Sequence, residues 1–213
     1  MKTDDLINML ATGAGAVEPH AAERRYAKAM VAGALGALLV MLSMLSIRRD
    51  LADAALLPMF WLKIGFVASV VAASLFAVLR LSRPGVRIDW VPRLIAAPLL
   101  VMWFIAACVL IEADPSERAE LFFGSTAAYC PFLIALLSVP AFVSLTWAMK
   151  ALAPTRPRLA GFAAGLLSGA TAALVYCLHC PEIEAPFIGF WYVLGMLIPA
   201  GVGAVLGRAL LRW

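Results

Sequence analysis

Charged residues are scarce in this 213-residue chain, where Asp, Glu, Lys and Arg together make up 14% and apolar residues make up 64%. Soluble domains carry about 25% charged residues, so this composition excludes an ordinary soluble globular domain. The mean hydropathy of +0.94 agrees with that exclusion. We therefore expect an integral membrane protein with little chain left over to fold in water.

Groups that usually carry chemistry are also few. Histidine occurs only at positions 20 and 179, and the chain has no serine–histidine–acid set, glycine-rich phosphate loop or HExxH helix. No Asp, Glu or His lies in the middle third of any apolar run, which argues against an ion-coupled transporter. We expect neither enzymatic activity nor a cofactor. A basic face with interleaved aromatic residues is also lacking, so direct nucleic-acid binding is not expected.

Apolar runs of about 20 residues, the length that crosses a bilayer core of about 30 Å, make up most of the chain. Backbone groups cannot stay unpaired in lipid, so the runs must be helical. The predicted fold is an all-α membrane protein, a six-transmembrane-helix bundle over residues 29–213 that follows a cytoplasmic segment over residues 1–28. The predicted spans cover residues 29–47, 60–81, 93–111, 130–149, 159–178 and 187–208.

The distribution of Lys and Arg between the runs predicts the orientation. Thirteen of the 17 lie in the N-terminal segment, the second and fourth loops and the C-terminus. The opposite side has Arg48, Arg49 and Arg118, and Lys63 is expected to extend outward from the edge of its span. Both termini are therefore predicted to be cytoplasmic, at a bacterial inner membrane. The acidic N-terminal segment and the long first run exclude a cleaved signal peptide.

Small residues recur every four positions in three of the runs, the first with Ala29, Gly33 and Ala37, a spacing that lets helix backbones approach closely in lipid. We expect them to pack helices within the bundle rather than to form a homodimer face. Prolines inside three spans predict kinks. The spaced glycines are Gly161, Gly165, Gly169, Gly203 and Gly207, and the prolines are Pro98, Pro140 and Pro199.

The four cysteines all fall near the predicted outer ends of spans; they are Cys108, Cys130, Cys177 and Cys180. Two of them precede proline, in Cys130-Pro131 and Cys180-Pro181. We expect the sulfurs of those two at the rim, within reach of water. Three interpretations stay open: small buried hydrophobes, a redox pair of Cys130 with Cys180, or a soft-metal site. The candidate metal ligands are Cys130, Cys177, His179 and Cys180.

The first residues of the chain predict a short amphipathic helix followed by a linker over Gly13–Pro19. Thr3 can cap it, and the two Asp residues that follow lie in the first turn, where the helix dipole favours negative charge. A helix this short is marginal in water, and its acidic start disfavours anionic lipid, so a groove on a protein is the expected partner. Its apolar face consists of Leu6, Ile7 and Leu10.

Together these features resemble the NrsF-type membrane anti-sigma factors, whose members hold an extracytoplasmic-function (ECF) sigma factor at the inner membrane and release it under stress. The resemblance rests on the N-terminal motif, the two Cys-Pro pairs, the six spans and the stretch from Gly189-Phe190-Trp191-Tyr192 through Pro199. It implies that Cys130 and Cys180 take part in sensing or in the stability of the complex. It also implies a sigma-binding set made of Thr3, Asp4, Asp5, Leu6, Ile7 and Leu10.

The function predicted on this basis is sequestration of an ECF sigma factor, released when a periplasmic redox or heavy-metal signal reaches Cys130, Cys177 and Cys180. Two other functions are alternatives. One is a thiol–quinone oxidoreductase that pairs Cys177 with Cys180 and Cys108 with Cys130. The other is a passive channel for small solutes. Neither alternative explains an acid-capped amphipathic helix before the first span.

Overall fold

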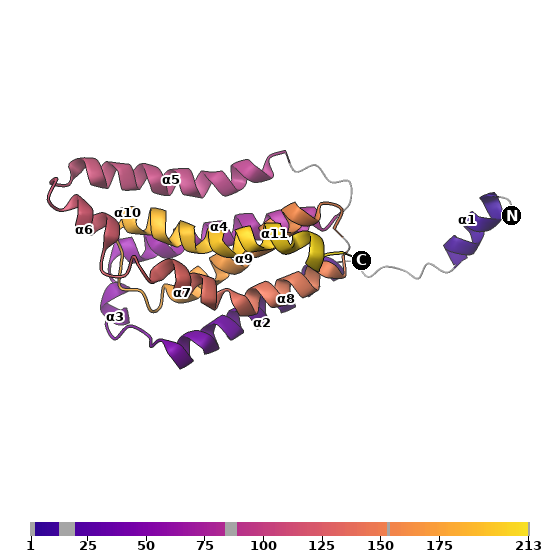
Figure 1. Cartoon of the computed structure of the whole chain (residues 1–213), viewed down its shortest axis with the longest axis horizontal. Helices are drawn as coiled ribbons and strands as arrows, with labels where there is room; N and C mark the ends of the chain where they lie inside the picture. The colour runs from indigo at the N-terminus through magenta and orange to yellow at the C-terminus, as the bar shows by residue number, and fades with distance from the viewer. Residues whose placement is uncertain (1–2, 13–19, 84–88, 153, 213) are drawn as a thin grey trace.

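Helices are the regular elements of the described chain, residues 3–12, 20–83, 89–152 and 154–212 of a computed structural model, and no strand occurs in those ranges. Figure 1 shows a bundle of long helices with the N-terminal helix apart from it. The elements are α1 Thr3–Thr12, α2 Ala21–Met44, α3 Leu51–Ala54, α4 Pro58–Leu81, α5 Val91–Glu112, α6 Arg118–Phe123, α7 Cys130–Leu137, α8 Val139–Lys150, α9 Pro157–Tyr176, α10 Ala185–Phe187, a π-helix Ile188–Tyr192, and α11 Val193–Leu210.

Among the described residues, five helices are long and apolar enough to cross a membrane, and α7 with α8 makes a sixth if the two count as one bent span. The predicted second, third and fifth spans agree with α4, α5 and α9 to within two residues. The predicted first span, 29–47, overlaps the second half of α2, but the helix ends at Met44, three residues earlier than predicted. The sixth span is one run over Ala185–Leu210 with a π-helical turn near its start.

The predicted fourth span is broken rather than merely kinked. Helices α7 and α8 meet at Ser138 at an angle of 43°. The cause is Pro140, which lies at the start of α8, has no N–H to donate and crowds the preceding turn. Pro98 and Pro199 lie inside α5 and α11, as predicted, without ending either helix.

Helix α9 is the centre of the bundle, with 14 of its 20 residues buried. Its glycines lie directly on α11: a Cβ atom on Gly161 would collide with the carbonyl oxygen of Gly203, and one on Gly165 with that of Pro199. The predicted packing within the bundle is confirmed. Because hydroxyl groups of α9 donate to carbonyls of their own helix, as Ser168 does to Ala164 at 2.8 Å, no polar side chain obstructs this contact.

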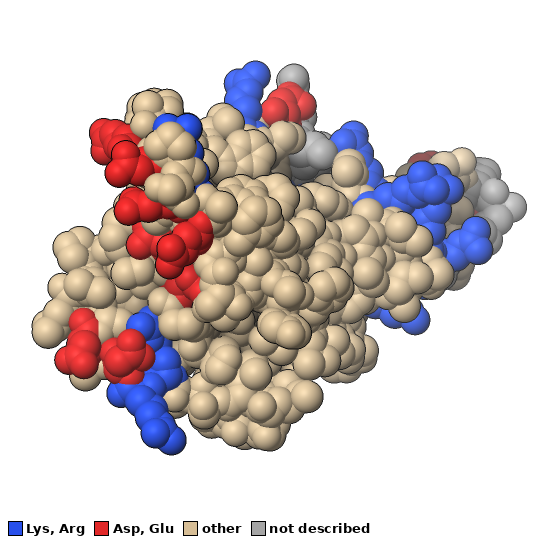
Figure 2. All heavy atoms as spheres, turned by 60° about the vertical axis from the view of Figure 1, so that its left-hand side comes forward, with Lys and Arg blue, Asp and Glu red and all other residues tan. Residues whose placement is uncertain are grey.

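The two ends of the bundle differ in charge. Acidic side chains gather at the end that carries α3, α6 and α10, together with a few basic ones, whereas most Lys and Arg residues lie toward the opposite end (Figure 2). Four glutamates line one hollow of about 450 Å³ there, namely Glu117, Glu120, Glu182 and Glu184. The asymmetry counted along the sequence is therefore also an asymmetry in space.

Replacement of Gly165 by Ala tests the close contact of α9 with α11. The new methyl group would overlap the backbone of Pro199 and Ala200, so we expect a loss of about 1–3 kcal/mol in stability. Gly201→Ala on α11 is the matched control, because nothing lies within 4 Å of its Cβ position. Thermal unfolding in detergent measures both, and equal midpoints for the two variants would contradict the assigned contact.

Candidate functional site

Helix α1 presents an apolar face that the rest of the chain does not cover. It begins at Thr3 and has Asp4 and Asp5 in its first turn, so the chain is helical where a short helix was predicted. The exposed fractions are 39% for Leu6 and 56% for Ile7, high for large apolar residues. Leu10 belongs to the helix, but its side chain lies outside the described residues, as does the predicted linker over Gly13–Pro19.

The second candidate region lies at the acidic end of the bundle, where three of the four cysteines converge. Cys130 is the first residue of α7, Cys177 follows the end of α9, and Cys180 lies in the loop between α9 and α10. All three are free thiols, and Cys130 and Cys180 form a hydrogen bond through their sulfur atoms. The structure thus brings together the two cysteines that the Cys-Pro pairs singled out, while Cys108 lies partly exposed on α5 outside this cluster.

The expectation that Cys130 and Cys180 are within reach of water is wrong, because both are 0% exposed. Proline does mark the helix start at Cys130 and the loop at Cys180, but both thiols are buried in the same hydrophobic cluster as Phe187, Ile188 and Tyr192 of the last apolar run. A helix end in a membrane protein is exposed only if no neighbouring element covers it. The sequence around a cysteine does not predict whether a distant segment buries it.

Two buried tyrosines border the thiols. The rings of Tyr176 and Tyr192 lie 5.8 Å apart, and the hydroxyl of Tyr176 is within hydrogen-bonding reach of Cys130 and Cys180. The hydroxyl of Tyr192 faces Cys177 and Cys180 and has no nitrogen or oxygen partner among the described residues. The thiols are therefore held in a site that combines soft sulfur groups with phenol hydroxyls.

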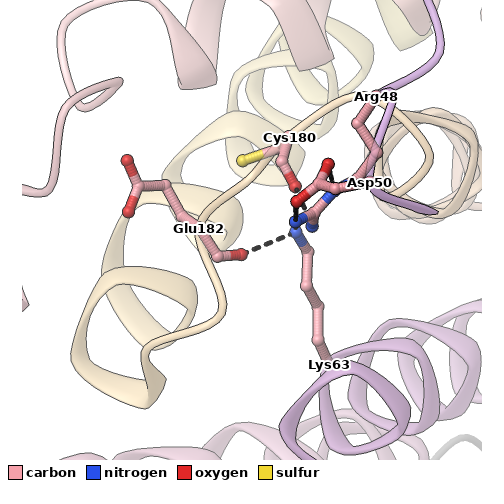
Figure 3. A network of polar contacts seen from close by, with 5 residues as sticks. All are labelled: Arg48, Asp50, Lys63, Cys180 and Glu182. Atoms are coloured by element: carbon pink, nitrogen blue, oxygen red, sulfur yellow. Dashed lines mark hydrogen bonds and ion pairs between the residues drawn. The ribbon is translucent and has the colours of Figure 1, made fainter. Parts of the chain in front are cut away.

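Lys63 closes this site from α4. Its expected outward extension is wrong: the side chain is 0% exposed and reaches the loop that carries Cys180 (Figure 3). Its ammonium donates to the carbonyl oxygens of Cys180 at 3.1 Å and Glu182 at 2.8 Å, and it lies 4.8 Å from the ring centroid of Tyr192. Three favourable contacts match the three N–H groups of an ammonium, which explains how a charge is tolerated there.

The loop that carries Cys180 is also bound from its other sides. Arg48, which follows α2, donates through its backbone N–H to the carbonyl of Leu178 at 3.1 Å and through its guanidinium to that of Cys180 at 3.4 Å. His179 Nδ1 lies 2.6 Å from the carbonyl oxygen of Ser46. On the far side, the carboxylate of Glu182 accepts hydrogen bonds from Ser125, through its backbone N–H at 2.8 Å and its hydroxyl at 2.7 Å.

Cationic side chains near this loop favour the charged forms of two acidic groups, the exposed carboxyl of Asp50 and the buried thiol of Cys180. The Arg48 guanidinium hydrogen-bonds Asp50 and lowers the pKa of that carboxyl to about 2. The hydrogen bond from the Cys130 thiol, together with the nearby Lys63 ammonium, holds the pKa of Cys180 below the usual value of a thiol. Cys180 is thus the member of the pair that the surroundings favour as a thiolate.

The π-helix over Ile188–Tyr192 positions the cover of the thiol site. Its wider turn places Tyr192 inside, while Phe190 is 47% exposed. Indole N–H groups fix it on two sides: Trp191 donates to the carbonyl of Phe122 at 2.8 Å, and Trp103 donates to that of Gly189 at 2.7 Å. The stretch Gly189-Phe190-Trp191-Tyr192 noted in the sequence is therefore fixed beside the thiols and contributes Tyr192 to the site.

The soft-metal interpretation gains no support from this geometry. In the described ranges, no three side chains of His, Cys, Asp or Glu are grouped to hold an ion. His179, one of the four candidate ligands, directs its Nδ1 to a backbone carbonyl instead. The residues that sequence reasoning missed are Lys63, Tyr176 and Tyr192. A lysine five residues inside an apolar helix was the one available signal, because such a charge is costly in lipid unless it is paired.

Substitution of Lys63 by Met tests its role in holding the loop. The change removes the donor to the carbonyl of Glu182 and leaves that of Cys180 with only the longer bond from Arg48, so we expect a loss of about 2 kcal/mol in stability. Lys150→Met is the control, because Lys150 is exposed at the end of α8. The measurement is thermal unfolding of both purified variants in detergent. Equal stability of the two would show that Lys63 does not anchor the loop.

Comparison with known proteins places the whole chain in one group. A family described as "Negative regulator of sigma F" (NrsF) matches residues 10–213. A protein of Azospira oryzae named "Probable anti-sigma-F factor NrsF" is 65% identical over 213 residues, and one of Caulobacter vibrioides named "Anti-sigma-F factor NrsF" is 41% identical over 217 residues. Both alignments cover all of this chain and all of the relative. No solved structure matches.

The family match begins at residue 10, whereas both relatives align from end to end and so include α1. The match covers every cysteine of the thiol site as well as Lys63. Both relatives carry names of regulatory proteins rather than of enzymes. On these grounds the chain belongs to the NrsF family of negative regulators of sigma F.

Proposed function

We propose that this protein is a membrane-bound anti-sigma factor that holds an ECF sigma factor at the bacterial inner membrane through α1. The observation that carries the proposal is the uncovered apolar face of α1 in a chain whose relatives are named anti-sigma-F factors. A short helix with exposed Leu6 and Ile7 gains stability when it lies in an apolar groove of a partner. Asp4 and Asp5 at its start favour a basic rim on that groove.

The proposed setting is a bundle of six spans with both termini in the cytoplasm. The gathering of most Lys and Arg residues at one end supports this orientation, because cytoplasmic loops are enriched in them. Helix α1 and the start of α2 then face the cytoplasm, where a sigma factor is found. The thiol site lies at the opposite, periplasmic end.

We propose that the pair Cys130 and Cys180 senses the periplasmic signal. Oxidation would join the two sulfurs in a disulfide, with two electrons and two protons passing to an external oxidant such as a small-molecule disulfide. The contact between the thiols favours this reaction, and the low pKa of Cys180 supplies the thiolate that attacks. Because the pair is buried, the oxidant has to reach it through an opening of the covering loop.

Helix α2 offers a direct mechanical connection between the two regions. Beyond its C-terminal end, Ser46 and Arg48 are bonded to the loop that carries Cys180. Its N-terminal end leads toward α1. Along its length, Gly33 lies against Ala141, and Ser144 donates to the carbonyl of Ala29 at 2.9 Å, so α2 is in close contact with α8. A shift of the loop on oxidation would therefore move the base of the sigma-binding helix.

Replacement of Leu6 and Ile7 by Glu tests the sigma-binding face. We expect co-purification of the sigma factor from mild detergent to fall about tenfold or more, because apolar anchors dominate such interfaces. The control is Asn8→Glu, which adds a charge on the opposite side of the same helix. Undiminished sigma factor with the double variant would refute binding through this face, provided that membrane levels of the protein match.

The sensing role has its own test. Membranes treated with diamide should yield a peptide pair cross-linked between Cys130 and Cys180 by mass spectrometry, and the sigma factor should be released at the same time. The control is Cys108→Ser, because that residue lies outside the thiol cluster. Release that persists in a Cys130→Ser, Cys180→Ser variant would exclude the pair as the sensor.

A further inference from the structure

A groove of about 630 Å³ lies between the first half of α2 and the end of α8. Three cationic side chains line one end of it, those of Arg24, Arg25 and Lys28. Farther along α2 the lining residues are small: Ala29 and Ala32 on α2, with Ser144, whose hydroxyl donates to the carbonyl of Ala29, on α8. The groove therefore combines a positive mouth with an apolar trough.

In the described part of the chain, neither Arg25 nor Lys28 forms an ion pair with an acidic side chain. Glu23, the acidic residue in the same turn of α2, binds Arg83 at 2.6 Å instead. The guanidinium of Arg25 lies over the ring of Trp147, 5.0 Å from its centroid, and its Nε is buried without a hydrogen-bond partner among the described residues. A buried N–H of a cation without an acceptor is costly, so the site favours an anion.

The apolar trough narrows the choice of anion. The whole groove, mouth included, follows α2 from Ala21 to Ala32 for about 16 Å at 1.5 Å per residue, and its apolar part begins at Ala29. An acidic protein surface or free phosphate would match the mouth but leave the trough empty. A ligand that carries both an anionic head and a hydrocarbon chain matches both parts, and Trp147 beside the mouth is typical of the membrane interface.

We propose that this groove binds one anionic phospholipid, with its phosphate at Arg25 and Lys28 and an acyl chain along Ala29 and Ala32. The site rests on the proposed function only in placing this end of α2 at the cytoplasmic surface of the membrane. Through this groove, the lipid composition of the inner leaflet would affect α2, the helix that follows the N-terminal segment. Bound lipid there would set the position of the sigma-binding helix.

Native mass spectrometry of the full-length protein in detergent tests the site, with added phosphatidylglycerol compared with phosphatidylcholine of the same chains. We expect phosphatidylglycerol to bind about tenfold more tightly, since each basic residue near an anionic headgroup contributes substantially. Arg25→Gln with Lys28→Gln should remove that preference. Ala32→Phe, which fills the trough without changing charge, should weaken binding of phosphatidylglycerol.

The matched control removes two charges elsewhere at the same end of the bundle: Arg156→Gln with Arg158→Gln, both exposed and neither in the groove, should keep the preference. Equal binding of the two lipids by the unaltered protein would overturn the proposal, and so would a preference that survives in the Arg25, Lys28 variant. Displacement of phosphatidylglycerol by inorganic phosphate, with no effect of Ala32→Phe, would show a simple anion site.

The same variants separate this inference from the proposed function. Lipid binding is measured without a sigma factor, so its failure leaves the role of α1 untouched. If the Arg25, Lys28 variant loses the sigma factor while its lipid preference is unchanged, the groove serves an acidic protein surface, and the lipid assignment is wrong.

Discussion

The interaction on which the thiol site depends is that between one buried ammonium and two peptide carbonyls. Lys63 holds the loop of Cys180 and Glu182 against α4, because its ammonium donates to the carbonyl oxygens of both residues. Everything else at this end follows from that fixed loop: Cys180 meets Cys130, Tyr192 covers both, and Arg48 ties the loop to the end of α2. A single charge thereby organises four separate segments of the chain.

The glycine contacts between α9 and α11 hold these two helices together at the centre of the bundle, next to the loop of Cys180. At Gly161 and Gly165 the two helices touch backbone to backbone, which leaves no side chain to rearrange. Gly33 of α2 makes a similarly close contact with the backbone of Ala141 on α8, whereas α5 buries only Val91, Met102 and Ala106. The bundle thus joins a stiff central pair to a more loosely attached outer helix, an arrangement that suits a protein with two packings.

Sequence reasoning succeeded where a pattern has a local cause. Apolar length located the spans, the spacing of Gly161 and Gly165 foretold the contact with α11, and Thr3 with two Asp residues foretold α1. It failed where distant segments decide: burial of Cys130 and Cys180 depends on Phe187 and Tyr192, and the inward path of Lys63 depends on carbonyls more than 100 residues away. The short α3 and α6 carry no periodic signal long enough to read.

The broken fourth span has a consequence for the width of the membrane that this protein suits. Its first part, α7, is eight residues long, about 12 Å at helical rise, and is inclined by 43° to α8. Straightening the break at Ser138 would lengthen the span by about 3 Å along the axis of α8, as follows from that angle and the helical rise. A thicker bilayer would favour the straighter form and a thinner one the bent form. Since Cys130 begins α7, the thickness of the surrounding bilayer acts on the same helix end as the chemistry of the thiols.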